Sequence, residues 1–228
     1  MSQVPQNDQN QQKTVYAQPS LQKNVRGIGQ FLINAIYFDL GGVIVRTEDK
    51  TPRAALGAEF GMTYDEMDAF VFRCQTAKLA SIGQISEQEH WREVARRLNL
   101  PEAEGPRLSQ AFFAGDRVDR ELLAFIQSLR PALKTGVISN AWDGLRAYML
   151  REGFLTPFDA VIISAEVGII KPDPRIYQRA LEKLNIDAEE AIFVDDFPEN
   201  IAAANALGMR GVHFQSAAQA LKEIQQIL

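Results

Sequence analysis

The fold is decided by one stretch of the sequence, Ile33-Asn34-Ala35-Ile36-Tyr37-Phe38-Asp39-Leu40-Gly41-Gly42-Val43. Its first six residues are largely apolar, which is typical of a strand buried on both faces of a parallel sheet. Asp39 follows this run directly, so a carboxylate stands where the expected strand ends. We therefore expect a β-strand over residues 33–38 with a polar group at its carboxyl end.

More short apolar runs follow further along the chain, and helical patterns separate them. Strands are expected at residues 134–139, 160–163, 191–194 and 211–214. Helices are expected at about residues 120–129, 143–151, 174–184, 199–207 and 217–227, with Gly208 placed as a C-terminal helix cap. This alternation predicts an α/β fold, namely a Rossmann-like parallel sheet with helices on both faces.

The segment over residues 47–116 interrupts the alternation because it is almost wholly helical. Its clearer helices are expected at residues 63–72 and 86–98, and Ser86 with Glu89 forms a capping box at the start of the second. A crossover between two parallel strands needs only one helix and its loops. The excess therefore predicts an inserted helical cap.

These patterns divide the chain into three parts. Residues 1–27 are rich in Gln and Asn, and we expect a disordered tail because the segment has little apolar surface to bury. Residues 28–46 and 117–228 form the expected core. Residues 47–116 form the expected cap, which would cover the edge of the sheet where ligands bind in open α/β folds.

Composition narrows the classes of function. The chain has 228 residues, of which 46% are hydrophobic and 23% charged, with a net charge of −5 and one cysteine. It shows no basic stripe for nucleic acid, no apolar stretch long enough for a membrane span and no secretory signal. We therefore expect a cytoplasmic monomer or homodimer that binds neither nucleic acid nor membranes.

Polar residues stand at or just beyond the expected strand ends. They are Asp39, the pair Ser139-Asn140, Lys171 and the pair Asp195-Asp196. Each one alone is ordinary turn or helix-cap chemistry. Strand ends of a parallel sheet meet in one crevice, however, where a carboxylate can attack phosphorus and form an acyl phosphate. Two carboxylates can hold Mg²⁺, and a lysine and a hydroxyl can hold phosphate oxygens.

The motifs together resemble those of the haloacid dehalogenase superfamily of hydrolases. They lie in order at residues 38–43, 138–140, 168–177 and 193–196. The cap between the first and second motifs is similar to that of the helical-cap members, and the last two motifs are similar to those of sugar-1-phosphate phosphatases and of the phosphatase domain of soluble epoxide hydrolase. The resemblance implies a Mg²⁺-dependent phosphatase that acts on a small-molecule phosphate ester, such as a sugar phosphate.

The resemblance also implies a role for each position. Asp39 would be the nucleophile, and Asp39, Asp196 and the backbone carbonyl of Gly41 would hold Mg²⁺. The phosphate-binding residues would be Ser139, Asn140, Lys171 and Gly42, with Lys171 also catalytic and with Asp195 and Asn200 in secondary places.

One position departs from the pattern of the phosphatases. They usually carry a second aspartate two residues after the nucleophile as general acid and base, and this chain has Gly41 there. An ester with a good leaving group, or another residue such as Asp195 or Glu199, would compensate. Two alternatives stay open, which are a non-catalytic or regulatory protein and a metal-independent 2-haloacid dehalogenase. Dehalogenases usually carry an aromatic residue where Gly41 stands and have no use for paired aspartates.

The substrate is expected to be selected by residues in or near the cap. The candidates are Arg46, Arg53, Arg73, Lys78, His90, Trp91 and Arg92. For each of them a solvated or packed side chain is the more ordinary interpretation. His90 is the one that titrates near neutrality when unperturbed. Trp142 either lines the crevice or packs beneath the following helix, and His213 is expected to be structural.

Overall fold

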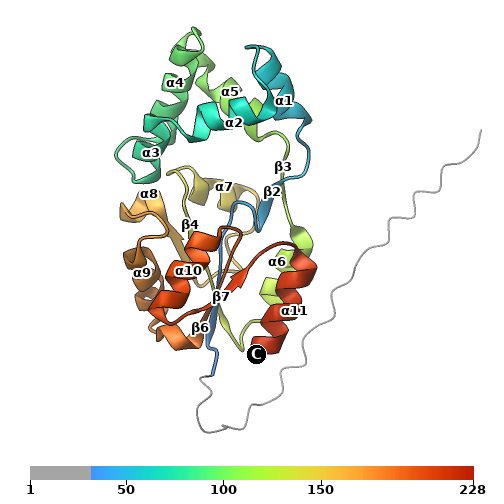
Figure 1. Ribbon diagram of the computed structural model, residues 1–228, viewed down its shortest axis with the longest axis vertical. Coiled ribbons are helices and arrows are strands. Elements are labelled where there is room, and N and C mark those ends of the chain that lie inside the picture. Colours follow the sequence, from blue (N-terminus) through green and yellow to red (C-terminus); the bar gives the residue numbers. More distant parts are fainter. Residues whose placement is uncertain (1–31) are drawn as a thin grey trace, which may run out of the picture.

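A parallel sheet forms the centre of the molecule. The computed structural model describes residues 32–228, and the tail predicted over residues 1–27 lies outside them. The strand order is β5-β4-β1-β6-β7 (Figure 1). The strands are β1 (Ala35–Phe38), β4 (Lys134–Ser139), β5 (Ala160–Ile163), β6 (Ala191–Asp195) and β7 (Arg210–His213), and every neighbouring pair is parallel. The predicted α/β fold is confirmed.

The apolar character of β1 follows from its central place in the sheet. Ile36 and Phe38 pack on one face, and Ala35 and Tyr37 pack on the other, because successive side chains of a strand point to opposite sides. The helices on the first face are α6 (Arg120–Ser128), α7 (Leu145–Arg151) and α11 (Ala217–Ile227), and those on the second are α9 (Pro174–Leu184) and α10 (Pro198–Leu207). The short helices α8 (Ser164–Val167) and η2 (Ala188–Glu190) complete the core.

A group of helices lies above the carboxyl ends of the strands (Figure 1). They are α1 (Thr51–Ala58), α2 (Tyr64–Phe72), α3 (Gln75–Ser81), α4 (Glu87–Arg97), η1 (Glu102–Glu104) and α5 (Gly105–Phe113). An antiparallel ribbon of β2 (Val45–Thr47) and β3 (Asp116–Val118) connects them to the core. This is the inserted helical cap of the expected fold, and the domain division at residues 47 and 116 remains a proposal. Within residues 32–228, no helix combines the length and apolarity that crossing a bilayer requires.

Two helices of the cap start at capping boxes. The hydroxyl of Ser86 accepts from the backbone N–H of Glu89 at 3.1 Å, and the Glu89 carboxylate accepts from the backbone N–H of Ser86 at 2.8 Å. Thr63 and Glu66 form the same reciprocal pair at the start of α2. Each box satisfies backbone donors that the first turn leaves free, which explains why the helices begin at these residues.

The cap is fastened to the core beside the end of β4. The indole Nε1 of Trp142 donates to the backbone oxygen of Ala77 in α3 at 3.3 Å, and Trp142 is buried in the apolar cluster of the cap. The backbone N–H of Glu87 donates to the carboxylate of Asp143 at 2.8 Å. Of the two interpretations of Trp142, the structure shows packing, although the partner is the cap rather than the helix that follows.

Candidate active site

The sheet brings the predicted polar residues to one edge. Asp39 follows β1, and its backbone N–H donates to the carbonyl oxygen of Val194 in β6 at 2.8 Å. Asp195 ends β6 on one side of β1, and Ser139 ends β4 on the other. Asp39 therefore lies between the ends of β4 and β6, the strands that flank β1, as the parallel order predicted.

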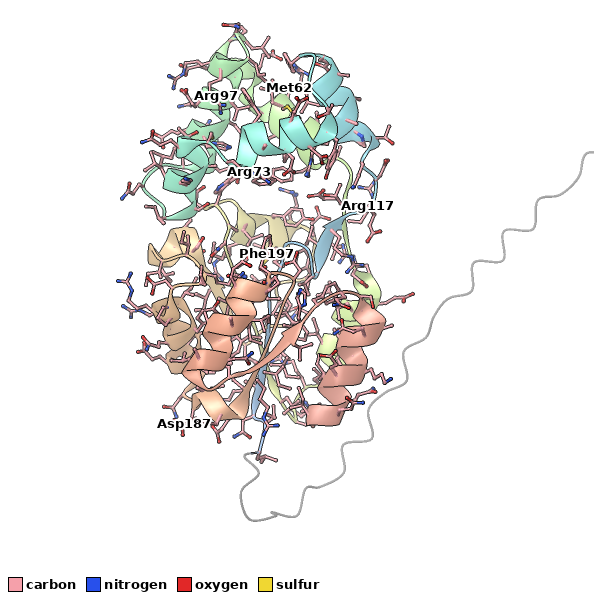
Figure 2. The ribbon with its side chains drawn as sticks, in the orientation of Figure 1. Met62, Arg73, Arg97, Arg117, Asp187 and Phe197 are labelled. Carbon is pink, nitrogen blue, oxygen red and sulfur yellow. The ribbon has the colours of Figure 1, made fainter. Side chains whose placement is uncertain are left out.

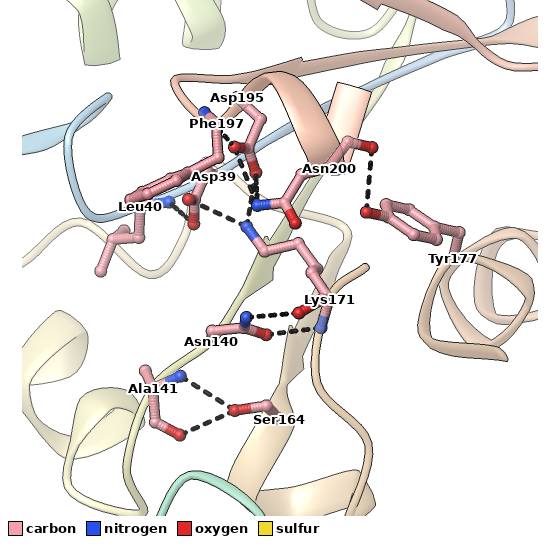
Figure 3. A network of polar contacts seen from close by, with 10 residues as sticks. All are labelled: Asp39, Leu40, Asn140, Ala141, Ser164, Lys171, Tyr177, Asp195, Phe197 and Asn200. Carbon is pink, nitrogen blue, oxygen red and sulfur yellow. Dashed lines mark hydrogen bonds and ion pairs between the residues drawn. The ribbon is translucent and has the colours of Figure 1, made fainter. Parts of the chain in front are cut away.

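Lys171 is the cation at the centre of this arrangement. Its Nζ lies 2.9 Å from Oδ2 of Asp39 and 2.6 Å from Oδ2 of Asp195 (Figure 3). Its side chain is only 1% exposed. A buried ammonium needs paired carboxylates to offset the loss of hydration, and here the pairing fixes Lys171 beside Asp39.

Asn140 holds the backbone of Lys171 in place. Its Nδ2 donates to the Lys171 carbonyl oxygen at 3.0 Å, and its Oδ1 accepts from the Lys171 N–H at 2.7 Å. Both ends of the carboxamide are therefore in use (Figure 3). The sequence assigned Asn140 to phosphate binding, whereas the contacts of its side chain indicate that it positions Lys171.

The two adjacent aspartates have different surroundings. Asp195 is fully buried, and besides Lys171 its carboxylate accepts from Asn200 Nδ2 at 3.0 and 3.1 Å and from the Phe197 N–H at 2.8 Å. Asp196 Oδ1 is buried without a hydrogen-bond partner among residues 32–228. Burial, together with the charge of Asp195, raises the pKa of the Asp196 carboxyl. The Asp195 carboxylate is thus fully hydrogen-bonded, whereas Oδ1 of Asp196 remains available to bind a cation.

These carboxylates suit a divalent cation. Asp39, Asp195 and Asp196 each present an oxygen, and these oxygens lie within 4.8 Å of one another. Lys171 is the one cation paired with them in the described part of the chain, so the group retains two negative charges. Oxygen ligands and this charge fit Mg²⁺, and the buried, unpartnered Oδ1 of Asp196 is the ligand atom that most needs a partner.

Two adjacent glycines have opposite surroundings. Gly42 has a left-handed φ of +77°, and a Cβ built on it would lie 2.2 Å from Oδ2 of Asp196. Its backbone therefore cradles the Asp196 carboxylate, a position that a larger residue would disturb. A Cβ built on Gly41 meets nothing within 4 Å, and this residue is exposed.

The nucleophile candidate is held in one orientation. Oδ1 of Asp39 accepts from the backbone N–H of Leu40 at 2.6 Å, and Oδ2 faces Lys171. Burial raises the pKa of Asp39 to about 6, with Lys171 lowering it and Asp195 raising it further. A desolvated carboxylate with a raised pKa is a stronger nucleophile than one in water, and perturbed groups of this kind are typical of functional sites.

Two neighbours of the site were not singled out as functional from the sequence. Nε2 of His213 lies 3.1 Å from the backbone oxygen of Asp196, so this histidine supports the loop that carries the carboxylate. The sheet register pairs His213 with Asp195, and only a strand-pairing prediction could have revealed that. Phe197, which follows Asp196, is 52% exposed beside the site.

The cap residues proposed for the substrate differ in their roles. Arg53 is buried and pairs with Asp68 at 2.6 Å and Asp116 at 3.3 Å, so it is structural. His90 is buried, as its more ordinary interpretation had it, and burial lowers the pKa of this histidine to about 4 and keeps it neutral. Arg73 is exposed on the side of the cap that faces the core (Figure 2).

Known proteins share both the sequence pattern and the fold. Bifunctional epoxide hydrolase 2 of Mus musculus is 34% identical over 57% of this chain, although the match spans only 24% of that longer protein. Validoxylamine A 7'-phosphate phosphatase of Streptomyces hygroscopicus subsp. limoneus is 30% identical over 84% of this chain and 91% of its own length.

Solved structures show the same fold. A HAD family enzyme of Bacteroides thetaiotaomicron, solved in complex with magnesium and inorganic phosphate, is 20% identical and superposes with a TM-score of 0.66. The match covers 79% of this chain and 93% of that one. A family model for haloacid dehalogenase-like hydrolases matches residues 33–208. Since this match covers most of the chain, the protein belongs to the haloacid dehalogenase-like hydrolase family.

Proposed function

We propose that the protein is a Mg²⁺-dependent phosphatase that hydrolyses a small phosphate ester through an aspartyl phosphate on Asp39. One observation carries the proposal. Asp39 is fixed beside a buried lysine, while the neighbouring Asp196 keeps an unpartnered, buried oxygen. A relative whose name gives a phosphate ester as its substrate, and a structural neighbour that binds magnesium and phosphate, support the same chemistry.

The proposed reaction has two steps. A carboxylate oxygen of Asp39 bonds to phosphorus as the bond to the leaving oxygen breaks, and that oxygen takes a proton from solvent because Gly41 offers none. Water then attacks the phosphorus as the bond between phosphorus and the Asp39 oxygen breaks. This frees the Asp39 carboxylate and inorganic phosphate, and the proton of the water passes to solvent. Lys171 Nζ and the Ser139 hydroxyl hold the phosphoryl oxygens through both steps. When bound by Asp39, Asp196 and the Gly41 carbonyl, Mg²⁺ neutralises charge that would otherwise repel the substrate.

Hydrolysis of a panel of phosphate esters tests this function. Phosphate release would be measured with Mg²⁺ and with EDTA, for the wild type, for Asp39→Asn and for Asp65→Asn as an exposed control in the cap. We expect release that needs Mg²⁺, disappears in Asp39→Asn and persists in the control. Release that survives EDTA or the loss of the Asp39 carboxylate refutes the proposal.

The open space at Gly41 favours one second candidate, a non-catalytic phosphate-binding protein. Such a protein would bind Mg²⁺ and inorganic phosphate without releasing phosphate from any ester. A 2-haloacid dehalogenase has no use for the unpartnered Asp196 oxygen. Loss of halide from a 2-haloacid in the presence of EDTA would identify that activity.

A further inference from the structure

Exposed apolar side chains gather around the candidate active site. Within residues 32–228, large hydrophobic residues are exposed at Leu32, Phe72, Leu150, Ile170 and Phe197. Ile170 directly precedes Lys171 and is 41% exposed, and Phe197 directly follows Asp196 and is 52% exposed. Single exposed hydrophobic residues are normal on a surface. Two that adjoin the lysine and the free aspartate of one site are a local enrichment.

A third exposed apolar residue, Phe72, reaches the same region from the cap. Phe72 ends α2, and its ring lies 5.7 Å from the ring of Trp142, which follows closely after Ser139 and the end of β4. It also packs edge-on against Phe112, with 5.3 Å between the ring centroids. Phe72 is still 42% exposed, although this aromatic cluster supports it. It therefore presents an apolar face where the cap meets the strand ends.

Gly41 leaves the space beside the nucleophile free of side chains. No atom lies within 4 Å of a Cβ built there. Selective binding of a sugar requires several placed polar groups around its hydroxyls. Near the site the chain exposes two phenylalanines and an isoleucine, with Arg73 beside Phe72 as a cation, and Gly41 adds no side-chain donor or acceptor.

We infer that the alcohol part of the phosphate ester is apolar, and that Phe72, Ile170 and Phe197 form the surface that contacts it. This inference rests on the proposed function and names its substrate class as hydrocarbon phosphates rather than sugar phosphates. A hydrocarbon chain laid on these side chains removes apolar area from water on both partners. Affinity should therefore grow with chain length.

Binding of non-hydrolysable alkylphosphonates separates this inference from catalysis. Dissociation constants for ethyl-, butyl- and octylphosphonate and for glucose 6-phosphate would be measured calorimetrically with Mg²⁺. All four ligands would be compared on the Asp39→Asn variant. We expect binding to tighten about two- to fourfold for each added methylene, and glucose 6-phosphate to bind more weakly than octylphosphonate. Phe72→Ala and Phe197→Ala should each flatten this dependence. Leu150→Ala removes an even more exposed apolar side chain, that of Leu150 in α7, and should leave the dependence unchanged.

The outcomes distinguish the two proposals. A flat dependence on chain length, or glucose 6-phosphate bound as tightly as octylphosphonate, overturns the inference even if the protein hydrolyses esters with Mg²⁺ and Asp39. A steep dependence that Phe72→Ala and Phe197→Ala reduce supports it. If that dependence is found but no alkyl phosphate is hydrolysed, the proposed phosphatase fails while the apolar surface stands.

Discussion

An aspartate placed at position 41 should accelerate the reaction without disturbing the fold. The Cβ of such a residue meets no atom within 4 Å, and exposed substitutions of this kind change the free energy of unfolding by at most about 0.5 kcal/mol. General acid–base help is worth about 10²–10⁴ in rate. At 1.36 kcal/mol per tenfold, this is about 3 to 5 kcal/mol of transition-state stabilisation. We expect Gly41→Asp to raise kcat by at least about 10²-fold on alkyl phosphates, whose alcohols leave poorly without a proton.

The assay compares an alkyl phosphate with an activated aryl phosphate at saturating Mg²⁺. The gain should be larger on the alkyl ester because the aryl group leaves without protonation. Gly42→Ala is the matched control, since its Cβ would lie 2.2 Å from Asp196 Oδ2 in a left-handed backbone that costs an L-residue about 1–2 kcal/mol. It should raise the Mg²⁺ concentration needed for activity. A folded Gly41→Asp protein with no gain on the alkyl ester refutes the reasoning.

Further predictions concern the groups around the site and in the cap. Lys171→Met leaves Asp39 and Asp195 facing each other without a cation. The free energy of unfolding, measured in urea, should therefore fall by about 3–5 kcal/mol. A variant as stable as the wild type would contradict this ion-pair account. His213→Ala should weaken Mg²⁺ binding by loosening the Asp196 loop, and His213→Gln, which keeps a side-chain N–H, should restore most of it; equal losses would argue against the contact. For His90, burial lowers the pKa from 6.5 to about 4, so the unfolded chain gains a proton first as the pH falls. Its neutral form therefore contributes stability that is lost between about pH 6.5 and pH 4, about 2 kcal/mol of it from pH 7 to pH 5. The free energy of unfolding of His90→Gln should therefore fall by about 2 kcal/mol less than that of the wild type between pH 7 and pH 5. An equal fall in the two proteins would show that His90 does not titrate in this way.

The strands and the meeting of the site residues could be predicted because both depend on local patterns. A run such as residues 33–38 has few alternatives to a buried strand, and parallel strands bring their carboxyl ends together whatever lies between them. Asp39, Lys171 and Asp195 therefore converge as expected. The capping box at Ser86 is equally local and equally visible in the sequence.

Which polar group of the site contacts which other group depends on packing, and the sequence does not show packing. Nothing in an Asp-Asp pair says that Asn200 will saturate Asp195 and leave Asp196 unpartnered. The same holds for Asn140, whose side chain binds a backbone that is distant in sequence. Packing also decides the surroundings of His90, because helical spacing does not reveal that its ring lies beside that of Trp142, with 4.4 Å between ring centroids.

The covalent intermediate on Asp39 tests the central claim most directly. The wild type would be acid-quenched during steady-state turnover with Mg²⁺, digested and analysed by mass spectrometry for a phosphorylated peptide containing Asp39. Because Gly41 supplies no base to activate the water that attacks in the second step, we expect this species to accumulate, to diminish in Gly41→Asp and to be absent in Asp39→Asn. Turnover with no phosphorylated Asp39 at any time, or phosphorylation that persists in Asp39→Asn, would contradict the account.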